Sequence, residues 1–304
     1  MSFLDILTQQ LVNGLVLGSF YALVALGYTM IFGVIKLLNF AHGDLYMVGG
    51  FVGFIALSAI SSVVGGDWPA VFIAMFFSMI AVGCLGVVIE RVAYHPMLSA
   101  PRLSILITAL AVSLVLQNAV LGLTGGQYQP FRADLGFGGI NIGNLFIQYN
   151  QMVLVGTAAA LMIGLELFVS RTQYGRAMRA VSIDKDMCQL MGINVPVVIA
   201  VTFFIGSALA AAAGTMAGAY YGSIWYFMGF LIGVKAFTAA VIGGIGSIPG
   251  AMLGGLILGL LEAFGTQIPG IGSEWKDVFS FAVLILVLVL KPTGLLGRPE
   301  QERM

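Results

Sequence analysis

Three polar side chains interrupt two long apolar runs near the start of the chain. Asn39, His42 and Asp44 lie within the short segment 36–44, and uncharged runs extend on both sides of it. Ionisable groups inside a membrane are costly and commonly mark the path of an ion or a solute. The alternative is a wetted cytoplasmic turn in which His42 pairs with Asp44. The residues alone leave both interpretations open.

A second segment, between Lys235 and Glu262, is rich in glycine and contains a proline. Such a composition cannot continue a regular helix, so we expect a broken helix pair within about 229–265. Broken helices at membrane depth face protein or a water-filled path; close helix packing by small residues is the alternative. The residues that we place near a substrate pathway here are Lys235, Thr238, Gly243, Gly244, Gly246, Ser247, Pro249 and Gly250.

Other kinds of chemistry find little support in the chain. With two histidines and scattered carboxylates, no nucleophile, base and orienting acid can be assembled. Cys84 and Cys188 form no metal-binding motif, and no G-x-x-x-x-G-K-[ST] phosphate loop occurs. Thirteen basic residues balance thirteen acidic ones, which argues against nucleic acid as a partner. We therefore expect no catalytic residue, cofactor or metal.

The elements that must position these residues are membrane helices. The chain is 60% hydrophobic and 9% charged over 304 residues, far from a soluble composition. A helix needs about 20 residues to cross a bilayer, and barrel-like alternation is absent. The charge-free runs are 6–35, 45–66, 68–89, 103–131, 135–165, 187–234, 236–261 and 278–290. The sequence predicts an all-α, polytopic transmembrane bundle of eight to nine spans, with nine preferred, in one domain, 1–304.

Lysine and arginine in the short loops predict the orientation of this bundle. The loops 90–102 and 171–195 and the tail 291–304 carry basic residues, so we expect them in the cytoplasm. The segments 65–69 and 124–149 are expected outside, and counting spans backwards places the N-terminus there too. The run 6–35 is too long for a signal peptide, so we expect none to be removed.

The loop 171–195 has a helical pattern of its own. Ala177, Val181, Cys188 and Met191 recur near the helical period, whereas Arg176 lies on another side with its charged neighbours. We therefore predict one short amphipathic helix that ends at Gly192. Its apolar face is small and poor in aromatic residues, which favours docking into a partner's groove over lying on the membrane surface.

The chain resembles a known family over essentially its whole length. It is similar to the smaller membrane subunit of the bacterial high-affinity branched-chain amino acid ABC importers. The matching blocks are Asn39-Phe-Ala-His-Gly43, Glu90-Arg-Val-Ala-Tyr94, Gly175-Arg-Ala-Met-Arg179 with Leu190-Met-Gly-Ile-Asn194, the segment 235–250, and Pro292-Thr-Gly-Leu-Leu-Gly297. Two departures are visible: His95 replaces a frequent arginine, and Met187-Cys188 replaces a pair of small residues.

The resemblance implies a subunit of the bacterial inner membrane that does not itself hydrolyse ATP. Its expected partners are a larger homologous permease subunit, two cytoplasmic ATP-binding subunits, a periplasmic solute-binding protein and the lipid bilayer. The family's coupling element to the ATPase falls on the segment for which the residues already predict a docking helix. Its residues are Gly175, Arg176, Arg179, Asp184, Leu190, Gly192, Ile193 and Asn194.

The resemblance implies leucine, isoleucine and valine as solutes, delivered by the binding protein. Permeases with similar blocks move urea or short amides, so that substrate class is an alternative. A stand-alone channel or secondary carrier for a small polar solute is another, although a lone channel does not need the basic helix within 175–194. A purely structural scaffold fits poorly with polar residues placed inside apolar runs.

Overall fold

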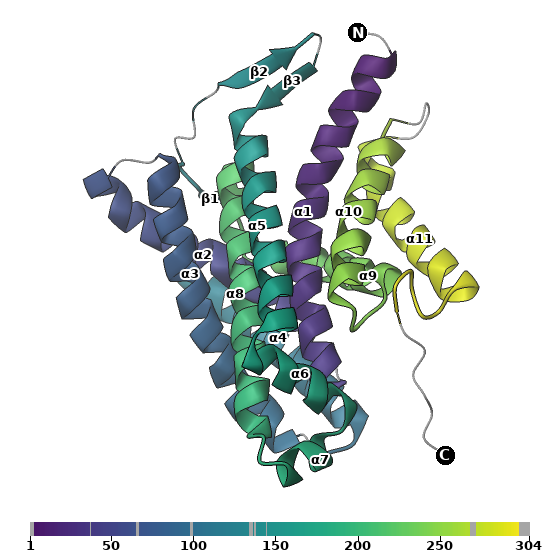
Figure 1. Ribbon diagram of the computed structural model, residues 1–304. Coiled ribbons are helices and arrows are strands. Elements are labelled where there is room, and N and C mark those ends of the chain that lie inside the picture. Colours follow the sequence, from purple (N-terminus) through teal and green to yellow (C-terminus); the bar gives the residue numbers. More distant parts are fainter. Residues whose placement is uncertain are drawn as a thin grey trace.

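The computed structural model shows a bundle of long helices (Figure 1). It describes residues 3–36, 38–64, 67–97, 100–133, 136, 138–143, 145–267 and 272–297. The strands β2 and β3 form a hairpin at one end of the bundle, beside the first turns of α1, and α6 and α7 lie at the opposite end (Figure 1). The last part of the predicted cytoplasmic tail, 298–304, lies outside the described residues.

The helices and strands account for most of the described chain. The α-helices are α1 (Phe3–Ile35), α2 (His42–Val64), α3 (Trp68–Ile89), α4 (Arg102–Thr124), α5 (Tyr149–Arg171), α6 (Gln173–Ile183), α7 (Lys185–Leu190), α8 (Val195–Tyr221), α9 (Met228–Gly243), α10 (Ile248–Gly265) and α11 (Lys276–Leu290). A π-helix, Glu90–Tyr94, and a 3-10 helix, His95–Met97, extend α3, and a second 3-10 helix, Ser273–Trp275, precedes α11. The strands are β1 (Gln129–Pro130), β2 (Gly139–Ile142), β3 (Leu145–Gln148) and β4 (Ser223–Ile224).

The predicted transmembrane bundle is confirmed. Within the described residues, seven helices are long and apolar enough to cross a membrane, and α9 is a shorter apolar helix. Two predicted runs were too long. The run 103–131 leaves its helix at Thr124, because Gly125 adopts a left-handed φ of 73° that ends α4. The run 135–165 becomes helical only at Tyr149, after the β2–β3 hairpin.

The long run 187–234 divides into four elements. It contains the end of α7, the whole of α8, the strand β4 and the first turns of α9. Gly222, with a φ of 69°, ends α8, and β4 then pairs antiparallel with β1, so that Gln129 lies opposite Ile224. Uniformly apolar composition concealed these boundaries, because an apolar strand and an apolar helix are alike by hydropathy alone.

Glycines let the central helices approach one another closely. A Cβ on Gly14 or Gly18 would lie 2.8–2.9 Å from the α10 backbone, at Leu260 or Leu256. Gly49 of α2 lies closer still to α8, since a Cβ there would overlap Ala211 Cα. The Gly49 carbonyl accepts hydrogen bonds from Thr215 of α8 (3.1 Å) and from Ser78 of α3 (2.8 Å). Small residues therefore join α1 to α10 and α2 to α8, as expected for helices that associate in lipid.

Candidate functional site

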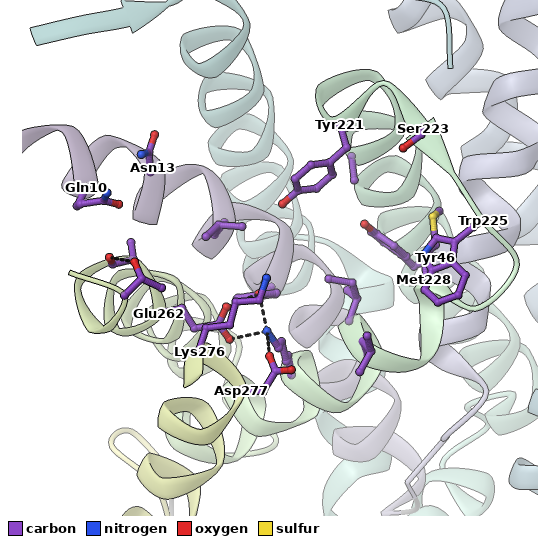
Figure 2. A pocket seen from close by; sticks show the side chains of 18 of the residues that line it. Gln10, Asn13, Tyr46, Tyr221, Ser223, Trp225, Met228, Glu262, Lys276 and Asp277 are labelled. Carbon is purple, nitrogen blue, oxygen red and sulfur yellow. Dashed lines mark hydrogen bonds and ion pairs between the residues drawn. The ribbon is translucent and has the colours of Figure 1, made fainter. Parts of the chain in front are cut away.

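A cavity of about 630 Å³ opens in the described part of the bundle, between α1, α8, α9, α10 and the start of α11 (Figure 2). Its apolar wall includes Leu17, Met228, Leu231 and Ile232. A volume of this size suits a small-molecule site. Charged groups lie on the side formed by α9, α10 and α11, and aromatic side chains lie across from them.

The charged side of the cavity is organised around Lys235 of α9, whose side chain is 7% exposed. Its Nζ lies 2.9 Å from Glu262 Oε1 and 2.6 Å from Asp277 Oδ1. The Tyr21 hydroxyl lies 3.5 Å from the same Nζ and donates a hydrogen bond of 2.7 Å to Glu262 Oε2. A buried ammonium is tolerated only with such partners, so these four residues form one connected network.

Glu262 is held on more sides than Asp277. Besides Lys235 and Tyr21, the Ser280 hydroxyl donates a hydrogen bond to Glu262 Oε1. The Glu262 side chain is 2% exposed, whereas that of Asp277, in the first turn of α11, is 44% exposed. Glu262 is therefore a fixed counter-ion of Lys235, and Asp277 is a second counter-ion that solvent can reach.

Aromatic residues form the other side of the cavity. Tyr46 and Tyr221 line it from α2 and α8, together with Tyr128 and Trp225. The rings of Tyr128 and Trp225 stack with centroids 5.5 Å apart, an arrangement that the β1–β4 pairing supports because it joins the residues adjoining these two rings. The cavity therefore combines aromatic and aliphatic walls with one buried cation and two carboxylates.

Asn39, His42 and Asp44 are buried, so the wetted turn with a His42–Asp44 pair is wrong. Asn39 accepts a hydrogen bond of 2.6 Å from the Tyr94 hydroxyl, and Asp44 accepts one of 2.9 Å from Gln117. The His42 ring lies edge-on to Tyr28, at a centroid distance of 4.8 Å. All three residues face the interior of the bundle, and none of them lines the cavity. Their burial follows from the packing of α2 against α1 and α8, which hydropathy does not reveal.

The predicted break between α9 and α10 is confirmed. Gly244 and Gly246 have φ angles of 105° and 93°, a region that favours glycine. Ser247 caps α10 by accepting a hydrogen bond of 3.2 Å from the Gly250 N–H. Pro249 lies in the first turn of α10, where a backbone N–H would have no partner within the helix. Gly243 packs directly on the Gly250 backbone.

The segment that follows α11 satisfies the free end of α9. The N–H groups of Leu295 and Leu296 donate hydrogen bonds of 2.9 Å to the carbonyls of Ile242 and Gly243. A Cβ on Gly294 would lie 2.5 Å from Gly244 Cα. Backbone groups at a helix end need such partners when they are buried, and here the chain itself supplies them.

The structure separates the predicted pathway residues into three places. Lys235 lies in the cavity wall, in the N-terminal half of α9, and the glycine break lies at the other end of the α9–α10 pair. Thr238 is buried, and its hydroxyl donates a hydrogen bond of 3.0 Å to the Val234 carbonyl. Gly246 and Pro249 are exposed at the break. Asn39, His42 and Asp44 occupy the third place, described above.

The expected coupling segment forms two helices rather than one. Asp184 ends α6 and caps α7, where its carboxylate accepts hydrogen bonds from the N–H groups of Asp186 (3.1 Å) and Met187 (3.0 Å). This competing side-chain bond breaks the predicted single helix. Gly192, with a φ of 80°, follows α7, and Asn194 caps α8. The helical period extends across Asp184, so the residue pattern alone concealed the break.

Several residues of the expected coupling segment have defined structural contacts. Gly175 packs against the Val169 backbone, and its N–H donates to the Thr172 hydroxyl (3.1 Å). Arg179 donates a hydrogen bond to the Val169 carbonyl at the end of α5. Ile193 packs partly against the core, whereas Arg176 is exposed and Leu190 is 84% exposed.

Lys185 Nζ lies 3.4 Å from the Ile35 carbonyl, and partial burial lowers the pKa of this lysine.

Part of the cavity lining was not predicted from the sequence. Tyr21 and Asp277 were not expected there, and Glu262 was noted only as a charge beside the glycine segment. The available signal was the isolated Lys235 and Glu262, one on each half of a broken apolar stretch. Such charges commonly pair within a membrane bundle.

Comparison with known proteins identifies close relatives. The family described as "Branched-chain amino acid transport system / permease component" matches residues 10–288. The high-affinity branched-chain amino acid transport system permease protein BraD of Pseudomonas aeruginosa is 48% identical over 301 residues, which cover 97% of each chain. The permease proteins LivH of Salmonella typhimurium and of Escherichia coli K12, which bear the same description, are each 45% identical over 302 residues, again 97% of each chain.

Proposed function

Because this chain belongs to the family of permease components of branched-chain amino acid transport systems, we propose that it translocates leucine, isoleucine and valine as a membrane-spanning subunit of an ATP-driven importer. The observation that carries the proposal is the near full-length identity of 48% to a permease of that description. The helical bundle and its internal cavity are the architecture that such a role requires.

The proposal includes partners, because the chain has no phosphate-binding loop of its own. A larger homologous permease would complete the membrane domain, two ATP-binding subunits would bind in the cytoplasm, and a periplasmic protein would deliver the solute. The α6–α7 segment supports the ATPase contact. It carries the exposed side chains of Ile183, Met187, Leu190 and Met191 at one end of the bundle.

We place the bundle in the bacterial inner membrane with α6 and α7 on the cytoplasmic side. The support is the density of arginine and lysine within 171–195. The start of α1 lies at the other end of the bundle (Figure 1), so it is on the periplasmic side in this orientation. The single permease domain, 1–304, remains part of this proposal.

The proposed solute route uses the cavity beside Lys235. Its polar groups and aliphatic walls match the charged head and the apolar side chain of an amino acid. The glycine break and the buried residues Asn39, His42 and Asp44 would then form a part of the route beyond this cavity. Helices that end within a bundle are places where backbones can shift as access alternates between the two sides.

The test is reconstitution of the four kinds of subunit in proteoliposomes. We expect ATP-dependent uptake of radiolabelled leucine that requires both the binding protein and the ATP-binding subunits. Uptake of urea or acetamide without leucine uptake would support the alternative substrate class. Leucine uptake by this chain alone, without ATP, would support a stand-alone carrier.

The coupling proposal predicts a strong effect of Leu190→Asp. Leu190 is 84% exposed, so the fold does not depend on it, but a docked ATPase would bury an unpaired carboxylate there. We expect ATP-driven leucine uptake to fall about tenfold or more, with an unchanged thermal midpoint of the purified transporter.

The matched control is Ile140→Asp, on the β2–β3 hairpin at the opposite end of the bundle, which should leave uptake near the wild-type rate. Wild-type uptake by the Leu190 variant would contradict the docking role. A charge reversal at Arg179 is a less clean test, because its guanidinium also caps α5; Arg176→Glu avoids this problem.

A further inference from the structure

The two carboxylates beside Lys235 differ in how firmly they are held. Glu262 has three donors, Lys235, Tyr21 and Ser280, and both of its oxygens are used. Asp277 has Lys235 as its one ion-pair partner among the described residues. Its side chain is 44% exposed, against 2% for Glu262. Separating Asp277 from Lys235 therefore leaves a wetted carboxylate and an ammonium that still has one fixed counter-ion.

The helices that carry these groups also differ in how closely they are packed together. Lys235 and Glu262 lie on α9 and α10, whose glycines bring their backbones into contact, as when Gly254 packs on Ala239. Asp277 lies in the first turn of α11. The cavity therefore has a rigid Lys235–Glu262 wall and a neighbouring carboxylate on a separate helix.

We propose that the zwitterionic head of an aliphatic α-amino acid inserts between Lys235 and Asp277 and replaces their direct ion pair. The solute carboxylate takes the place of Asp277 on the Lys235 ammonium, and the solute ammonium binds Asp277. This inference rests on the proposed function and names the residues that select its substrate class.

Charge balance favours this exchange over the binding of a singly charged solute. A zwitterion that enters the pair gives an alternating row of ammonium, carboxylate, ammonium and carboxylate, so each buried charge keeps a partner of opposite sign. A solute with only a carboxylate would leave Asp277 unpaired. A solute with only an ammonium would compete with Lys235 for Asp277 and leave two cations together.

The rest of the cavity fits the remaining parts of such a solute. Leu17, Leu231 and Ile232 provide an apolar surface for an aliphatic side chain, and Tyr46 and Tyr221 add aromatic rings on the side of the cavity across from the charged groups. Neutral solutes such as urea have no charge to exchange with the ion pair. The same residues therefore favour amino acids over short amides.

The experiment measures protection of a cysteine placed beside the ion pair. Thr266 lines the cavity one turn after Glu262, so Thr266→Cys is introduced with Cys84→Ala and Cys188→Ala into the assembled transporter in nanodiscs. The rate of modification by a small water-soluble thiosulfonate is measured without ATP, both in the absence and in the presence of the binding protein. The probes are L-leucine, leucinamide and 4-methylpentanoate, each over a range of concentrations.

We expect leucine to slow the modification at lower concentrations than leucinamide or 4-methylpentanoate. Asp277→Asn should weaken protection by leucine about tenfold or more, because a charged hydrogen-bond partner of its ammonium is lost. The same variant should strengthen protection by 4-methylpentanoate, because Asp277 no longer competes for Lys235. This opposite change distinguishes recognition from a merely structural role. Glu274→Gln, the same change three residues away on an exposed side chain, should alter neither.

Three results would overturn the proposal. The first is equal protection by all three probes. The second is that Asp277→Asn weakens the protection by leucine and the protection by 4-methylpentanoate to the same extent. The third is protection that requires the binding protein but no solute. The last would place a loop of that protein in the cavity. If wild-type proteoliposomes still take up leucine, any of these results removes the ion-pair exchange and leaves the proposed function intact.

Discussion

Replacing Lys235 by methionine is expected to lower the free energy of unfolding by about 3–5 kcal/mol. The change shortens the side chain by one heavy atom and removes the cation that faces Glu262 at 2.9 Å. Glu262 is then buried without a charged partner, because only the hydroxyls of Tyr21 and Ser280 remain. Denaturant unfolding of the purified chain in mixed micelles measures the loss.

Two companion variants make this result decisive. Lys276→Met removes a lysine from the same cavity, but its side chain is exposed and forms none of the ion pairs described above, so stability should change little. The double variant Lys235→Met with Glu262→Met removes both buried charges and should recover most of the loss. A single Lys235→Met variant as stable as the wild type would show that the ion pair does not support the fold.

Gly214→Val is expected to prevent correct packing of α8 against α2, at a cost of at least about 3 kcal/mol. A Cβ at this position would overlap the backbone carbonyl of Tyr46 and would lie 2.9 Å from the Gly50 nitrogen. Both are backbone atoms of a helix, so no flexible side chain can move aside. The yield of monodisperse protein and its thermal midpoint measure the effect.

Gly164→Val on α5 provides the matched control, because a Cβ there meets nothing within 4 Å. The substitution is the same and the residue is also in a membrane helix, so stability should stay within about 1 kcal/mol of the wild type. Equal losses in the two variants would attribute the effect to valine in a helix rather than to the contact between α2 and α8.

Local features of the fold were predictable because their causes are local. A charge-free run of sufficient length predicts a membrane helix, and glycines together with Pro249 predict the break between α9 and α10. The β2–β3 hairpin and the division at Asp184 were not foreseen. In both places an apolar or helical pattern continues through a point where one turn or one side-chain hydrogen bond changes the backbone direction.

The candidate site was less predictable, because its contacts join distant parts of the chain. Tyr21 donates to Glu262 across 241 positions, and Lys235 reaches both Glu262 and Asp277. Nothing near Tyr21 in the sequence indicates this contact. The wetted turn, one of the two interpretations left open for 36–44, is wrong for a similar reason: the partners of Asn39 and Asp44 are Tyr94 and Gln117, on other helices.

The hydrogen bonds from Leu295 and Leu296 to the end of α9 also bear on the order in which the bundle is built. During synthesis these two residues leave the ribosome after α9, α10 and α11. The last carbonyls of α9 therefore lack these hydrogen-bond donors until the later segment has been made. The α9–α10 pair therefore cannot reach its final form as an independent hairpin. A fusion joined directly after Gly297 would interfere with the formation of these late hydrogen bonds.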